Sequence, residues 1–124
     1  MFKFTVKRKY WLRGEGSDNS FLLRDAEQNE DMLMCCLGFG ALACGYQEED
    51  IIGAANPNDM VDYRPLGFFQ QITEEIHELQ EYKPNQKGID LMATNDAESL
   101  SDTEREAKLT ELFASIDVEV TFED

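Results

Sequence analysis

The longest apolar run in the sequence, residues 32–45 (MLMCCLGFGALACG), constrains the fold more than any other segment. Leu37, Ala41 and Cys44 are spaced at i, i+4 and i+7, which is a helical period and not the alternation of a strand. Apolar or small side chains on all sides indicate a helix that is covered on most of its surface. Gly45 suits the left-handed residue that commonly ends a helix. The run therefore predicts a central buried helix, with a buried strand as the alternative.

The chain has 124 residues, which is the usual length of one domain. A domain of this size buries roughly two thirds of its unfolded surface and needs no metal or disulfide. The N-terminus lacks the apolar core of a signal peptide, and no run has the length of a membrane span. The three cysteines are odd in number and crowded together, so reduced thiols are expected. These features predict a single cytoplasmic domain.

The net charge of −15 is the strongest compositional signal, and it is unevenly distributed. Residues 1–24 contain six basic and two acidic side chains, a net +4, so residues 25–124 carry −19. Such a surface repels nucleic acid and anionic lipid, and it attracts basic partners. We therefore expect no direct contact with nucleic acid or membrane, and a protein partner with a basic surface.

Both ends of the chain alternate apolar and charged residues, as half-buried strands do. The outward residues of Phe2–Lys7 are mainly basic, and those of Val118–Glu123 are mainly acidic. Opposite charges across a strand pair contribute about 0.2–1 kcal/mol each. We predict that these two strands are neighbours in one small antiparallel sheet, packed by three to four helices around the central helix. The fold class is then α+β.

Several shorter elements complete this prediction. Ser101 to Glu104 forms a capping box, and the helix that follows buries Leu109, Leu112, Phe113 and Ile116. A further helix is predicted over Pro65–Tyr82, with Phe68, Phe69, Ile72, Ile76 and Leu79 on one face and glutamates on the other. We also expect a short strand at Phe21–Leu23, a helical turn or two at Glu48–Ile52, a helix end at Lys83–Gly88 and weak order over Ile89–Leu100.

The cysteine segment also carries a resemblance. Met34-Cys35-Cys36-Leu37-Gly38, followed by Cys44-Gly45, resembles a group of small uncharacterised bacteriophage and prophage proteins with a Cys-Cys-Leu-Gly motif and a further cysteine downstream. Asn95-Asp96 and the ending over residues 112–122 are similar as well. The resemblance implies a phage or mobile-element accessory protein with no established activity, so it supplies no catalytic residues. Small acidic phage proteins often bind host or defence machinery, anti-CRISPR proteins among them, which is an association by type.

The cysteines are the first candidate site. At the N-terminus of the predicted helix, entered at Cys35–Leu37, the helix dipole would lower the pKa of the Cys35 or Cys36 thiol and make it a nucleophile. A nucleophile needs a base, and the one histidine, His77, is predicted on a solvated helix face. The alternative is that these cysteines are small apolar core residues. Their spacing to Cys44 lacks the Cys-x₂₋₄-Cys pair of a zinc site, so no metal or cofactor is expected.

The acidic residues supply the remaining candidates. Asp59 and Asp62 share a loop, but the calcium-binding loop pattern is absent. Asn95-Asp96 is predicted to be a turn. The acidic face of the Pro65–Tyr82 helix is either a solvated face or a docking surface for a basic groove, in which its glutamates would mimic phosphates. The predicted partner-binding residues are Glu74, Glu75, Glu78 and Glu81.

The sequence thus favours a non-catalytic acidic interaction protein of phage type, acting in the host cytoplasm on a host or defence-system protein. Two alternatives remain open at this point. One is a thiol-dependent enzyme that uses Cys35 or Cys36, and the other is a structural or regulatory homodimer.

Overall fold

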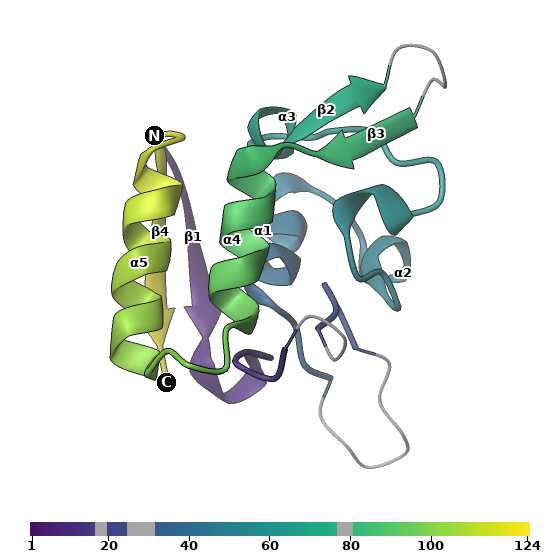
Figure 1. Ribbon diagram of the computed structural model, residues 1–124. Coiled ribbons are helices and arrows are strands. Elements are labelled where there is room, and N and C mark those ends of the chain that lie inside the picture. The colour runs from purple at the N-terminus through teal and green to yellow at the C-terminus, as the bar shows by residue number, and fades with distance from the viewer. Residues whose placement is uncertain (17–19, 25–31, 77–80) are drawn as a thin grey trace.

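The computed structural model describes residues 1–16, 20–24, 32–76 and 81–124. Helix α5 lies in front of the strands β1 and β4, α4 stands beside α5, and α1 lies behind α4 (Figure 1). The elements of this part are β1 (Phe2–Lys7), α1 (Cys36–Cys44), α4 (Gln86–Asp96), α5 (Asp102–Ala114) and β4 (Val118–Glu123).

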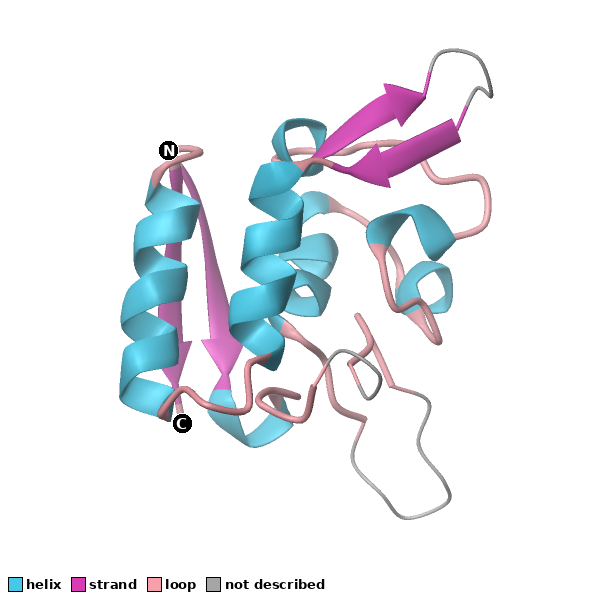
Figure 2. Cartoon of the chain, in the orientation of Figure 1, coloured by secondary structure: helices cyan, strands magenta, loops and turns pink. Residues whose placement is uncertain are grey.

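The other side of the molecule is built from short elements and connecting turns (Figure 2). They are α2 (Glu48–Ile51), a 3₁₀ turn at Pro57–Asp59, α3 (Phe69–Ile72), β2 (Thr73–Ile76) and β3 (Glu81–Pro84). A further 3₁₀ turn follows β1 at Arg8–Tyr10. Among the described residues, no helix combines the length and the apolar character that a membrane crossing requires.

The central helix α1 is confirmed. Its first six residues, 36–41, are buried, and Gly45 ends it at a φ of 109°, in the left-handed region. Gly38 allows a close approach, because a Cβ there would lie 1.8 Å from the carbonyl oxygen of Leu22. The glycine inside this helix is therefore a packing requirement, which outweighs its poor helix propensity of about 1 kcal/mol.

The pairing of the two terminal strands is confirmed, and their antiparallel direction is wrong. β1 and β4 run parallel, with Phe2 opposite Val118 and Lys7 opposite Glu123. Alternation along a strand shows which side chains are buried, and it says nothing of direction. The direction follows from α5, which runs opposite to β1 and joins β4 through a tight turn at residues 115–117 (Figure 1). The α+β class stands, with two separate two-stranded sheets.

The predicted helix over Pro65–Tyr82 is wrong except at Phe69–Ile72, which form α3, and its residues 77–80 lie outside the described residues. α3 ends at Ile72, and residues 73–76 and 81–84 form the antiparallel strands β2 and β3. The carbonyl oxygens at the end of α3 are already bonded: the N–H of Asn85 donates to that of Ile72 at 2.9 Å, and the Thr73 hydroxyl donates to that of Phe69 at 2.7 Å. The helical spacing of the apolar residues gave no sign of these hydrogen bonds, which end α3.

Three other predictions are also wrong. The segment expected to be weakly ordered, Ile89–Leu100, belongs as far as Asp96 to the helix α4, which begins where the side chain of Asn85 accepts from the N–H of Gly88 at 3.1 Å. Gly88 therefore lies in the first turn of this helix and does not end an earlier one. Residues 21–23 make no extended strand, although Leu23 forms an isolated bridge to Ile52.

The two predictions for α2 and α5 are confirmed. α2 spans Glu48–Ile51. α5 begins with the reciprocal capping box, in which the Ser101 hydroxyl accepts from the Glu104 N–H and the Glu104 carboxylate accepts from the Ser101 N–H, both at 3.1 Å.

Candidate functional site

The cysteine pair lies in the core. Cys35 is 4 % exposed and Cys36 is fully buried. Burial raises the pKa of the Cys35 thiol to about 12 and raises that of Cys36 well above its ordinary value. A thiol with such a pKa stays protonated at neutral pH and is a poor nucleophile. The candidate base, His77, lies outside the described residues, and the burial of both thiols favours a packing role for the cysteines.

Asn95 is a highly connected polar side chain of the core, and the prediction of a turn at Asn95-Asp96 is wrong. The side chain is 1 % exposed at the end of α4. Its Oδ1 accepts from the indole N–H of Trp11 at 2.8 Å and from the backbone N–H of Cys36 at 3.0 Å. Its Nδ2 donates to the carbonyl oxygen of Leu12 at 3.0 Å. Asn95 thus caps the N-terminus of α1 from another helix, a role that a local motif cannot reveal.

Arg105, a second buried polar side chain, holds the loop between α4 and α5 by hydrogen bonds. Its side chain is 2 % exposed and donates to the carbonyl oxygen of Leu100 at 3.1 Å and to Asp102 at 3.2 Å. It also donates to the carbonyl oxygen of Ala97. These bonds make Arg105 a structural residue, and they remove its positive charge from the surface.

The basic N-terminal segment is largely neutralised within the fold. Five of its six basic side chains form ion pairs, four of them with acids of residues 102–124: Lys3 with Glu119, Lys7 with Glu123, Arg8 with Glu106 and Asp124, Arg13 with Asp102, and Arg24 with Glu15. Residues 1–24 and 102–124 together contain eight basic and ten acidic side chains. The large negative excess of the protein therefore lies elsewhere.

Residues 45–82 hold the largest share of that excess, with nine acidic side chains against one basic side chain, Arg64. They contain α2, the 3₁₀ turn at Pro57–Asp59 and most of the β2–β3 hairpin, which lie on the side of the molecule away from α5 and β4 (Figure 1). We call the exposed acids of this segment the acidic side: Glu48, Glu49, Asp50, Asp59, Asp62, Glu74, Glu75 and Glu81.

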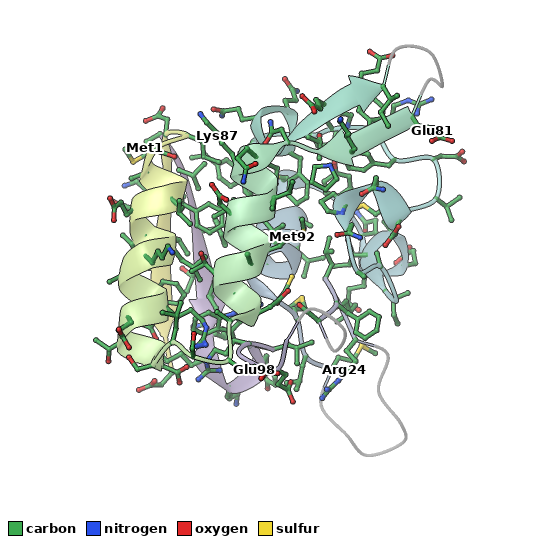
Figure 3. All side chains as sticks on the ribbon, viewed as in Figure 1. Met1, Arg24, Glu81, Lys87, Met92 and Glu98 are labelled. Carbon is green, nitrogen blue, oxygen red and sulfur yellow. The ribbon has the colours of Figure 1, made fainter. Side chains whose placement is uncertain are left out.

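The predicted partner-binding glutamates do not share a helix face. Glu74 is opposite Lys83 in the hairpin, at 3.4 Å between the charged groups, and Glu81 is opposite Ile76 on the same face. Glu75 is opposite Tyr82 and projects from the other face, because side chains alternate along a strand. Glu78 lies outside the described residues. Glu81 is on the hairpin, across the molecule from Met1 (Figure 3).

Two hollows lie against residues 60–64, and the larger of them also adjoins this hairpin. The larger has a volume of about 460 Å³ and is lined by Asn58, Met60, Asp62, Tyr63, Arg64, Glu81 and Tyr82. The smaller, of about 130 Å³, shares Met60, Asp62, Tyr63 and Arg64, and adds Tyr46, Asp50, Val61 and Leu66. Three of the four tyrosines of the chain line these two hollows. Val61, which lines the smaller hollow, is 86 % exposed.

Aspartates 59 and 62 have separate roles in this region. Asp59 accepts from the backbone N–H of Asn56 at 3.1 Å in a capping box, whereas Asp62 takes a left-handed φ of 52° and lines both hollows. Within the described ranges, no three His, Cys, Asp or Glu side chains gather as a metal ion would require.

Comparison of the chain with protein-family models, with curated proteins and with solved structures finds no match in any of the three.

Proposed function

We propose that this protein is a non-catalytic binding protein whose acidic side docks on a basic surface of another protein. The observation that carries the proposal is the separation of charge: the basic N-terminal segment is paired internally, while residues 45–82 carry nine acids against one base. Such a patch attracts a basic partner at long range and orients it during encounter.

The shape of the acidic side supports docking as well as attraction. Tyrosines are enriched in protein interfaces and charged residues form their rims, and here the tyrosine-lined hollows lie among Asp50, Asp62 and Glu81. Val61 and Leu66, exposed by 86 % and 40 %, add apolar contact area. Charge alone would give a weak, salt-sensitive contact, and these residues supply surface that a partner would bury.

The resemblance to phage proteins extends the proposal to the kind of partner. The basic surface would belong to a host or defence-system protein, and the acidic side would occupy the place that nucleic acid takes there. This proposal places the protein in the host cytoplasm. The thiol-dependent alternative has less support, because Cys35 and Cys36 are buried and their pKa values are raised.

Capture from a bacterial lysate tests the proposal. The immobilised protein is expected to retain a partner in low salt and to release it in high salt, because the attraction between surface charges is screened. The Glu48→Gln/Glu81→Gln variant should retain less of that partner. The Glu98→Gln/Glu111→Gln variant has the same change of charge outside the acidic side and should retain as much as the wild type.

Two outcomes would contradict the proposal. One is the absence of any partner that salt releases. The other is an equal loss of the partner in both double variants, because net charge and not the acidic side would then account for binding.

A further inference from the structure

The larger hollow has a rigid aromatic wall. The rings of Tyr63 and Tyr82 meet edge to face at 5.5 Å between centroids, and Tyr46 stacks on Tyr63 at 6.2 Å. The Tyr63 hydroxyl is bonded to the hydroxyl of Thr73 at 3.1 Å, and the Tyr46 hydroxyl accepts from the N–H of Leu66 at 2.9 Å. These contacts fix the wall within the protein itself, so a ligand that packs against it pays little to order it.

The rim of the hollow carries two carboxylates. Asp62 comes from the turn before Tyr63, and Glu81 comes from the start of β3. Neither carboxylate has an ion pair or a hydrogen bond to a side chain or backbone group in the part of the chain that the structure describes. Arg64 is the one cation of the lining, and its Nη1 donates to the carbonyl oxygen of Tyr63 at 3.0 Å. The lining therefore has an excess of one negative charge.

An aromatic wall beside carboxylates matches an arginine side chain better than any other. The guanidinium group of arginine is planar and always charged, it stacks on aromatic rings, and its N–H groups bond carboxylates in pairs. A lysine ammonium shares the charge, but it has neither the plane nor the paired donors. The volume of about 460 Å³ lies within the range of about 300–1,000 Å³ that ligand pockets span.

We infer that the larger hollow binds one arginine side chain of the partner protein, with its guanidinium group held by Asp62, Glu81 and Tyr82 of the lining. The inference rests on the proposed function and names the chemistry of its central contact. The rest of the acidic side then steers the partner toward this contact, and the hollow decides which basic residue is accepted.

A titration with a small probe tests the hollow directly. N-acetyl-arginine amide is added to the ¹⁵N-labelled protein, and N-acetyl-lysine amide, which has the same charge, serves as the comparison. The arginine probe should shift the amide signals of residues 58–64 and 81–84 most strongly, and the lysine probe should bind several-fold more weakly. Equal shifts from both probes, or shifts centred on other acids, would overturn the inference.

Single substitutions should change the affinity for the arginine probe in opposite directions. Glu81→Gln should weaken binding of the arginine probe about two- to fivefold, which is the range that an exposed ion pair supplies. Arg64→Gln removes the competing cation and should strengthen it. Glu111→Gln on α5, an equal change of net charge outside the hollow, should have no effect. Equal weakening of probe binding by Glu81→Gln and Glu111→Gln would overturn the inference, since net charge alone would then explain it.

A substitution of Tyr82 tests the contact between the guanidinium group and the aromatic ring. Tyr82→Leu keeps an apolar side chain and should abolish the preference for arginine over lysine. Its amide spectrum shows whether the protein has kept its fold; if the fold is lost, the Glu81 and Arg64 variants decide the question.

Failure of this inference differs from failure of the proposed function. A captured partner that binds Asp62→Asn and Glu81→Gln as tightly as the wild type, and is lost when Glu48 and Glu49 become Gln, would reject the arginine contact and keep the docking function. A lysate without any partner released by salt would reject the docking function, and the inference that depends on it would fall with it.

Discussion

Removal of the Asn95 side chain should destabilise the protein more than any exposed substitution. Asn95→Ala leaves three buried groups without their partner: the indole N–H of Trp11, the backbone N–H of Cys36 and the carbonyl oxygen of Leu12. The residues that carry these groups are 3 %, 0 % and 2 % exposed. Each buried group that loses its hydrogen bond costs about 1–3 kcal/mol.

The simple sum, about 3–9 kcal/mol, overstates the cost, because losses within one network are not additive and water can enter the space. We expect a loss of about 3–5 kcal/mol, a large part of the 5–15 kcal/mol that domains typically have. Urea denaturation followed by the fluorescence of Trp11, the single tryptophan, measures it. The variant Asn58→Ala, at an exposed position, should cost no more than about 0.5 kcal/mol.

A second substitution at the same position tests the direction of the bonds. Asn95→Asp keeps an acceptor for Trp11 and Cys36, but it loses the donor to Leu12 and places a second carboxyl beside Asp96. Burial and that neighbour would raise the pKa of the new carboxyl above its unfolded value of about 3.9. Its penalty should therefore grow as the pH rises from 4 to 7. A loss below about 1 kcal/mol for Asn95→Ala, or no pH dependence for Asn95→Asp, would refute this account of the network.

Three further predictions concern the central helix. Gly38→Ala should cost about 1–3 kcal/mol or more in thermal unfolding, because the new Cβ would lie 1.8 Å from the carbonyl oxygen of Leu22; a neutral result would show that the backbones can separate. With a thiol reagent at pH 8, the half-buried Cys44 should react first, and Cys35 and Cys36 should react only at the rate of unfolding; immediate reaction of all three would contradict their burial. The pKa of the Cys35 thiol is raised to about 12, so its contribution to stability is fully present below an unfolded pKa of about 8.5 and is lost as the pH rises toward 12. Chemical denaturation at pH 8 and pH 11 should show that loss, and it should be smaller in Cys35→Ala.

The elements that the sequence determined are those whose signals are local. The capping box at Ser101 and the apolar spacing of residues 109–116 predict α5 because a helix start and its buried face are encoded within a few turns. The same holds for α1, whose all-apolar run requires burial and whose Gly45 ends it. The alternation of both terminal strands, with lysines on one and glutamates on the other, was sufficient to predict that they are neighbours.

Tertiary contacts decided the rest. The direction of β4 depends on the turn that joins it to α5, and the end of α3 depends on Asn85, which comes from the far side of the hairpin. Because that hairpin replaces the predicted helix, Glu74 and Glu75 project from opposite faces, and Glu81 reaches the tyrosine-lined hollow instead of a common acidic face. Asn95 bonds atoms of residues 11, 12 and 36, and no window of sequence contains such a set. The sequence alone determined that the protein is acidic and that its cysteine helix is buried. The arrangement of the acids around a tyrosine-lined hollow required the packed fold. Hydrogen bonds between distant segments select among backbones that local preferences leave open.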